Sequence, residues 1–166
     1  MEHAEATINH FLVEVFNEIL KTEENCLTEA SCRGLSLREL HVIEAVCNAE
    51  DSQADDRATA IAERLRVTAG SLTTAVAILE KKGFLTRTRD QRDRRVVHLQ
   101  ATETGRAANA CHQRFHEEMV ADILHILSVE EQVVLLRALG GVTAFFRDKY
   151  AKARGPDKAG AAPGTP

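Results

Sequence analysis

Residues 57–100 constrain the fold more than any other part of this sequence. Their apolar positions first recur at the i, i+3, i+4 and i+7 spacing of one buried helix face, at Ala58, Ile61, Ala62 and Leu65. Asp56 stands directly before this pattern and is the expected N-cap. After a brief turn at Arg66, Thr68 can cap a second helix, which Gly83 ends. The apolar side of that second helix consists of Leu72, Val76 and Leu79.

Two short runs that favour β-structure follow, at residues 84–89 and 96–100. The polar turn between them contains Arg92, Arg94 and Arg95, so the pair predicts a hairpin with an arginine-rich tip. A helix, a tight turn, a second helix and a hairpin form the plan of a winged helix-turn-helix. The expected fold class is mainly α (α+β).

The charge of the chain is divided unevenly along the sequence. Residues 57–95 contain ten Lys/Arg and four Asp/Glu, a balance of +6, whereas residues 1–56 contain three and thirteen, a balance of −10. Residues 96–166 carry eight of each, so the overall −4 hides a basic module in an acidic chain. A basic module on a fold that can enter a groove indicates DNA binding. The alternative is a solvated surface that happens to be basic, and the accompanying helices and hairpin disfavour it.

The remaining composition predicts a long-helical protein of the cytoplasm. There is no apolar run near 18 residues, and acidic residues interrupt the N-terminus where a signal peptide would need an apolar core. The four cysteines show no CxxC spacing, which favours reduced thiols. All three prolines fall in the last eleven residues, so the body of the chain is free to form long helices.

Helices are expected on both sides of the basic module. The first spans about residues 5–28, from the helical spacing of Ile8, Phe11, Leu12, Val15, Phe16, Ile19 and Leu20. Ser36 with Glu39 forms a capping box for a helix that stops around Asn48, before an acidic loop over residues 49–55. Thr102 is expected to cap a long helix from Glu103, and Ser128 with Glu131 to open the last one.

The last helix is apolar around much of its circumference, in the runs 133–139 and 142–146. Such a helix must be covered on more than one side, and a second subunit is the expected cover. The predicted organisation is a single domain over residues 1–150, with a winged helix-turn-helix core at about 36–102. Dimerisation helices at about 5–28 and 103–150 flank this core, and residues 151–166 form a disordered tail.

The hairpin carries the pattern Asp90-x-Arg92-Asp93-Arg94-Arg95, followed by Val96-Val97-x-Leu99-x-x-Thr102-x-x-Gly105. This pattern resembles the wing and the following helix cap of MarR-type regulators, and the resemblance covers about residues 5–150. Within that family four stretches are similar to the FabT branch, repressors of bacterial fatty-acid synthesis genes. They are EKKGF at 80–84, QRDRRVVHL at 91–99, Gly105-Arg106, and His112-x-Arg114-Phe115-His116-x-x-Met119-Val120. The resemblance implies a homodimeric repressor of double-stranded DNA, with acyl-acyl carrier protein as corepressor.

The second helix of the motif offers small residues to DNA. Gly70, Thr73, Thr74 and Ala77 let the helix sit deep in the major groove, and no arginine on that face can pair with guanine. This predicts an A·T-rich, pseudo-palindromic operator, whose narrow minor groove attracts arginine. The resemblance implies that Arg94, or alternatively Arg92, enters the minor groove. It also implies that Asp93 orients a neighbouring arginine, a role that is compatible with ordinary hydrogen bonding within the turn. The predicted DNA contacts are Thr68, Gly70, Ser71, Thr73, Thr74, Lys81, Arg92, Asp93, Arg94 and Arg95.

Two effector sites are open from the sequence. An acyl chain could enter an apolar passage lined by Phe16, Leu20, Phe115 and Met119, although these residues could equally be plain core. Alternatively, Glu24, His41, His112 and His116 could hold Zn²⁺, because His112 and His116 share one helix face at i, i+4. These positions resemble a metal site of zinc-responsive members of the same family, and the alternative is a polar interior without metal.

Other functional classes fit the sequence poorly. No nucleophile–base pairing, phosphate loop or CxxC motif indicates an enzyme, and no cofactor is required. A peroxide sensor would need tyrosines near an N-terminal cysteine, whereas the single tyrosine is Tyr150. A helical protein-interaction bundle would explain the dimer helices but not the basic hairpin module.

Overall fold

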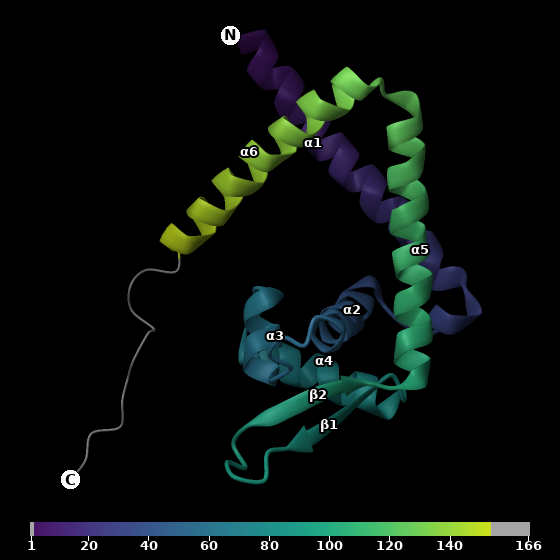
Figure 1. The fold of residues 1–166 in the computed structure, drawn as a ribbon, viewed down its shortest axis with the longest axis vertical. Coiled ribbons are helices and arrows are strands. Elements are labelled where there is room, and N and C mark those ends of the chain that lie inside the picture. Colours follow the sequence, from purple (N-terminus) through teal and green to yellow (C-terminus); the bar gives the residue numbers. More distant parts are fainter. Residues whose placement is uncertain (1, 154–166) are drawn as a thin grey trace, which may run out of the picture. The chain divides into compact units, whose positions relative to one another are not determined.

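The computed structural model describes the backbone of residues 2–153 and the side chains of residues 5–149. The elements run α1 (Glu2–Glu23), two 3₁₀ turns (Glu24–Thr28 and Ala30–Cys32), α2 (Leu37–Asp51), α3 (Ala58–Arg64), α4 (Ala69–Lys81), β1 (Leu85–Arg89), β2 (Val97–Ala101), α5 (Glu103–Ile126) and α6 (Val129–Ala153). The helices α2, α3 and α4 gather beside the β1–β2 hairpin (Figure 1). This arrangement confirms the predicted mainly helical winged helix-turn-helix.

The helix-turn-helix forms where the sequence signals place it. Thr68 caps α4, and its hydroxyl oxygen accepts from the backbone N–H of Ser71 at 3.1 Å. The turn before it contains Arg66 at φ +55°, and α4 ends next to Gly83 at φ +80°. Glycine is favoured at such a positive φ because a Cβ is strained there. Both predicted boundaries of α4 are therefore confirmed.

The cap predicted for α3 is wrong. The N-cap position is Arg57, one residue later, and it makes no side-chain cap hydrogen bond. The Asp56 carboxylate instead lies 2.6 Å from Nδ1 of His98 on β2. The Asp56 side chain, which the local pattern predicted to cap the helix, therefore contacts a residue 42 positions later in the sequence.

The hairpin pairs antiparallel, with Leu85 opposite Ala101 and Arg89 opposite Val97. Its base is fastened to α5 by Thr102, whose hydroxyl donates to the carbonyl of Gly83 at 2.7 Å and accepts from the N–H of Gly105 at 3.0 Å. A Cβ on Gly105 would stand 2.2 Å from the carbonyl oxygen of Phe84. The first turn of α5 can therefore approach the hairpin only with glycine at this position.

One apolar core holds these elements together. It includes residues that are almost wholly buried, among them Leu40, Ile43 and Val46 of α2, Ile61 of α3, Leu72, Val76 and Leu79 of α4, Leu85 of β1 and Leu99 of β2. Burying one such side chain contributes about 1.5–3 kcal/mol. The predicted inward faces of both helices of the motif are confirmed, and the opposite side of α4 is left free.

Three helix ends differ from the prediction. The first helix stops at Glu23 and continues as 3₁₀ turns, whereas α2 runs to Asp51, through the start of the expected loop. The Ser36–Glu39 capping box that opens α2 is present as predicted. At the other end of the chain, α6 reaches Ala153, past the predicted tail boundary, and the rest of that tail lies outside the described residues.

The backbone contacts divide the chain into two compact units, one up to Glu118 and one from Met119 onward. The first contains the helix-turn-helix, the hairpin, α1 and most of α5. In the second, Ser128 and Glu131 form the predicted reciprocal cap of α6, with distances of 2.8 and 3.3 Å. Among the described residues, no helix is both long and apolar enough to cross a membrane.

Candidate nucleic-acid interface

The outer face of α4 carries the small polar residues that the sequence assigned to DNA. Gly70, Thr73, Thr74 and Lys81 are exposed, and Ser71 is half-buried near the start of the helix. The opposite face consists of the buried Leu72, Val76 and Leu79. The helix is therefore held by one side and free along the other.

The hydroxyl protons of the two threonines are already used. Thr73 donates to the carbonyl of Ala69 at 2.8 Å, and Thr74 donates to that of Gly70 at 3.1 Å. Each hydroxyl oxygen keeps lone pairs that can accept from the amino group of adenine or cytosine. The exposed methyl groups can contact the methyl group of thymine. This face suits base edges that donate or are apolar.

The loop at the tip of the hairpin, the wing (residues 90–96), has a fixed internal structure. The Asp90 carboxylate accepts from the backbone N–H groups of Arg92 and Asp93 at 2.7 and 2.9 Å, and these hydrogen bonds lower the pKa of Asp90. The backbone of Asp90 and Val96 closes the loop at 3.0 Å. The wing is therefore an ordered turn on which the arginine side chains are presented.

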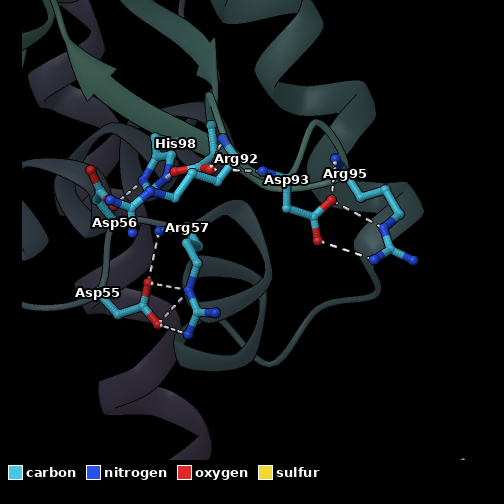
Figure 2. Close-up of polar contacts among 8 residues, drawn as sticks. Asp55, Asp56, Arg57, Arg92, Asp93, Arg95 and His98 are labelled. Atoms are coloured by element: carbon cyan, nitrogen blue, oxygen red, sulfur yellow. Dashed lines mark hydrogen bonds and ion pairs between the residues drawn. The ribbon is translucent and has the colours of Figure 1, made fainter. Parts of the chain in front are cut away.

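The three wing arginines differ in their partners. Arg95 donates to the Asp93 carboxylate through Nε at 3.1 Å and Nη2 at 3.2 Å, a pair visible in Figure 2, and this arginine lowers the pKa of Asp93. The backbone N–H of Arg95 also donates to Asp93, at 3.0 Å. Asp93 thus both orients an arginine and shapes the turn. Arg94 is exposed and has no ion pair among the side chains that the structure describes.

The loop before α3 brings a further arginine to this surface. Arg57 donates through Nε to the two carboxylate oxygens of Asp55 at 2.8 and 2.9 Å and also through Nη2 (Figure 2). The guanidinium holds the pKa of Asp55 well below its usual range. Arg57 and Arg95 lie at the rim of one hollow of about 230 Å³ between α3, α4 and the wing. The sequence analysis had not assigned Arg57 to DNA, although it opens the basic module.

A second basic group missed by the sequence lies on α2. Arg38 is exposed in the first turn of this helix and has no ion pair within the described part of the chain. It lines a hollow of about 390 Å³ together with Ser71 and Thr74 of α4. The sequence analysis did not assign Arg38 to the interface because residues 1–56 are strongly acidic overall. Its position beside α4 depends on how α2 packs.

The same end of α2 is locked to the end of α4. Lys82 donates to both carboxylate oxygens of Glu39 at 2.8 and 2.9 Å and to the carbonyl of Gly34 at 2.6 Å. Burial raises the pKa of Glu39, but the hydrogen bonds from Lys82 and Ser36 outweigh it and the net pKa lies below the ordinary value. This contact fixes the direction of α4 relative to α2.

A separate polar cluster lies where α1, α2 and α5 meet. Oε1 of the buried Glu23 stands 2.8 Å from Nε2 of His41 and 3.4 Å from Nε2 of both His112 and His116. The two latter nitrogens are 3.2 Å apart. The three predicted histidines therefore converge, but Glu24 was the wrong carboxylate. Glu23 follows Ile19 by four residues and Leu20 by three, so it lies on the same face of the first helix as these apolar residues. This helical spacing was the missed signal.

The residues predicted to line an acyl passage differ in exposure. Phe16 is 61% exposed, whereas Leu20, Phe115 and Met119 are half-buried. The Phe115 ring packs edge-on against His116, with the ring centroids 5.3 Å apart. An acyl site at these four residues stays a prediction.

Comparison with known proteins agrees with this geometry. The MarR family model matches residues 35–97, and no curated protein matches the sequence. The DNA complex of FabT from Streptococcus pneumoniae is 35% identical, with a TM-score of 0.80 over 87% of this chain and 98% of that chain.

Two further structures share the fold alone. They are the S. aureus MepR–DNA complex, at 17% identity and TM-score 0.69 over 82% and 96% of the two chains, and the adhesin competence repressor AdcR from Streptococcus pyogenes, at 24% and 0.59 over 86% and 97%. The helix-turn-helix, the wing and the 35% identity over nearly the whole of a relative lead to one assignment. The chain belongs to the MarR family of DNA-binding transcriptional regulators.

Proposed function

We propose that this protein is a homodimeric repressor that reads a pseudo-palindromic, A·T-rich operator. The observation that carries the proposal is the pairing of a free small-residue face on α4 with an ordered wing whose Arg94 has no ion pair among the described residues. The helix face suits the major groove and the free guanidinium suits a narrow minor groove. Arg38 borders α4 without an ion pair among the described residues and can contact a phosphate, whereas Arg57, also beside α4, must first release Asp55.

The dimer part of the proposal comes from exposed apolar side chains. On α6, Val134, Leu136 and Phe145 are 58–68% exposed, and on α1 both Phe11 and Phe16 are exposed by about 60%. Apolar faces of this extent need a cover, and a second copy of the chain supplies one through the same helices. Two-fold symmetry then presents two copies of α4 to half-sites about one helical turn apart.

Fatty-acid synthesis genes are the proposed regulon, and acyl-acyl carrier protein is the proposed corepressor. The support is the 35% identity with the FabT–DNA complex over 98% of that chain. Genomic sites bound by the purified protein should be sequenced and aligned. Symmetric A·T-rich sites upstream of fatty-acid synthesis genes are expected. Symmetric sites elsewhere would overturn the regulon and keep the repressor, whereas no enrichment of any site would overturn the repressor itself.

A zinc-responsive repressor is the second candidate, and the polar cluster of Glu23, His41, His112 and His116 favours it. Tetrahedral Zn²⁺ with ligand distances of 2.0–2.1 Å sets neighbouring donor atoms about 3.3 Å apart. Four of the donor separations in the cluster are 2.8, 3.4, 3.4 and 3.2 Å. Glu23, His41 and His112 each offer one donor atom, and these three atoms lie within 4.8 Å of one another. The donor set and its spacing therefore fit zinc.

A second carboxylate lies beside the same donor nitrogen of His112. Nε2 of the wholly buried His112 lies 3.6 Å from the Glu44 carboxylate, whose pKa this histidine lowers. Zn²⁺ held here would bind neutral imidazole rings and join α1 to α2 and α5. Zinc content after purification and titration with the metal alone test the site. One equivalent per chain supports it, and a chain that binds no zinc at neutral pH overturns it.

A further inference from the structure

His98 lies between two carboxylates that belong to different parts of the DNA-binding module. Its Nδ1 is 2.6 Å from Oδ1 of Asp56, in the loop before α3 (Figure 2). Its Nε2 is 3.7 Å from Oδ2 of Asp90, the first residue of the wing. The histidine side chain is 30% exposed. It therefore bridges the helix-turn-helix and the wing from the strand between them.

Each carboxylate also holds backbone on its own side. Asp90 accepts from the N–H groups of Arg92 and Asp93, so it determines the direction in which the wing leaves β1. The carbonyl of Asp56 accepts from the N–H of Leu99 at 3.1 Å, beside the isolated bridge between Arg57 and His98. A change at His98 therefore acts on two backbone segments that both border the α4 face.

The imidazole can serve both carboxylates only as a cation. Neutral imidazole has one N–H and one lone pair, so it can donate to one carboxylate and must turn a lone pair towards the other. The protonated ring has an N–H on both nitrogens, so it donates to Asp56 at 2.6 Å and attracts the Asp90 carboxylate, 3.7 Å away, through its charge. In agreement, the hydrogen bond with Asp56 raises the pKa of His98 against the lowering effect of burial, and the charges of Asp56 and then Asp90 raise it further.

Most of the other charged groups near this strand are paired or lie on the other face of the hairpin. Across the hairpin His98 is opposite the uncharged Thr88, and the arginines on either side of Thr88 alternate to the other face. Glu50 of α2 accepts from the N–H of Ala101. The other charged groups around the site are Asp55 and Arg57 of the loop before α3, Arg87 and Arg89 of β1, and Arg92, Asp93 and Arg95 of the wing.

We propose that His98 is the positioning residue of the wing, and that its proton couples operator affinity to pH. The protonated ring ties Asp90 to Asp56 and so holds the wing, with Arg94 at its tip, in the direction set by the helix-turn-helix. Loss of the proton leaves one N–H, which stays with the nearer Asp56 carboxylate, so Asp90 loses its attraction to the ring and the wing is released from the loop before α3. This inference rests on the proposed contact between the wing and DNA.

The sign of the effect follows from the raised pKa. The contribution of His98 to the wing arrangement is complete below its ordinary value of 6.5 and is lost as the pH rises through the higher value of the folded protein. Operator affinity should therefore fall from neutral towards alkaline pH. A difference of about one unit between the pKa of His98 in the bound and free protein corresponds to about tenfold in affinity.

The test is fluorescence anisotropy with an operator duplex between about pH 6 and 9 at constant ionic strength. The variants are His98→Gln, which cannot be charged, and Asp90→Asn, whose amide oxygen can still accept from the wing N–H groups but carries no charge. Asp55→Asn is the matched control, because Asp55 carries a carboxylate in the same loop but does not contact His98. Arg94→Ala reports separately whether the wing contributes to affinity.

Wild-type protein and Asp55→Asn should lose affinity as the pH rises, whereas His98→Gln and Asp90→Asn should give flat profiles near the weaker, alkaline value. A wild-type slope in both His98→Gln and Asp90→Asn overturns the inference, as does a flat wild-type profile when Arg94→Ala lowers affinity. Wild-type protein that binds no operator at any pH overturns the proposed function instead. If His98→Gln does not fold, the Asp90→Asn profile decides alone.

Discussion

Arg94 and Arg95 are adjacent and chemically identical, yet the structure gives them different environments. Arg95 is held by Asp93 through two hydrogen bonds, whereas Arg94 is exposed without an ion pair among the described side chains. A guanidinium already bound to a carboxylate must lose that partner before it can enter a groove. Arg94 is therefore the residue of the pair that can contact DNA without rearrangement.

Replacing Arg94 with Ala should weaken binding to the specific operator by about 1–3 kcal/mol. The fold should not change, because the residue lies on an exposed loop held by Asp90. Anisotropy with the operator measures the affinity, and thermal unfolding checks the fold. Arg92→Ala is the comparison for the alternative assignment. Unchanged affinity in both variants would remove the wing from the mechanism.

At the scale of elements, most of the module was predictable because its signals are local. The Thr68 cap, Gly83, the capping box at Ser36 and the β-prone runs of the hairpin are all signals within a few residues. The misplaced features depend on contacts distant in sequence. Asp56 lies 2.6 Å from an imidazole nitrogen of His98, 42 residues later, rather than capping α3, and no pattern local to the helix end reveals that partner.

The candidate metal cluster could also be predicted only in part from the sequence. Glu23 and Glu24 are adjacent, and only the exact end of α1 decides which of them faces the histidines. The helix ends at Glu23, and this residue is 3% exposed. Helix ends are the least certain boundaries in a sequence, so the histidines were predictable while the carboxylate was one residue off.

Removing the side chain of Arg38 should test whether α2 joins the interface. Arg38 lines one hollow together with Ser71 and Thr74, and it makes no ion pair with a described side chain of α4. A phosphate contact carries no sequence information. Arg38→Ala should therefore weaken specific and non-specific DNA alike and reduce the slope of log affinity against log salt by about one. A loss confined to the specific operator would instead indicate base contact.

The Lys82–Glu39 pair between α2 and α4 should contribute stability that depends on pH. The folded pKa of Glu39 is lower than its ordinary 4.5, so the contribution is present above that value and is lost as the pH falls through the lower folded value. Lys82→Met should cost about 1–2 kcal/mol at neutral pH. The difference should shrink towards about pH 3 in urea unfolding.

Lys81→Met is the matched control for this measurement, because Lys81 is a neighbouring exposed lysine that does not contact Glu39. Its effect on stability should be small at every pH. An equal, pH-independent loss in both variants would contradict a specific role for the Lys82–Glu39 contact.

At the scale of the whole molecule, the proposed dimer follows from apolar faces that the single chain leaves exposed. Leu136→Asp on α6 places a charge on such a face, where Leu136 is 68% exposed. Loss of one buried leucine costs about 1.5–3 kcal/mol of association energy, and the charge adds to this. Sedimentation should show monomers at concentrations where the wild type is dimeric, with Arg137→Ala unchanged. A monomeric wild type would contradict the dimer.

Two effectors are then possible at the junction of α1 and α5, and they demand different chemistry. An effector changes DNA affinity only through its different affinity for the two conformations. Each methylene of an acyl chain contributes about 0.8 kcal/mol when buried, which is ample for a long chain. Acylated carrier protein should therefore raise operator affinity, carrier without the chain should not, and Phe115→Gln should abolish the response while leaving basal binding.

Zinc predicts a different set of results from the same assay. The response should vanish with chelator and in His41→Ala or His116→Ala, which are half-exposed positions, but not in His125→Ala of α5. It should also weaken below about pH 6, because imidazole must be neutral to bind a metal. If acylated carrier protein acts in every histidine variant, the cluster is a polar interior and the acyl reading stands. If neither ligand changes DNA affinity, the effector site lies outside both sets of residues. Protonation of His98 is then the one proposed mechanism left by which this protein would regulate its DNA affinity.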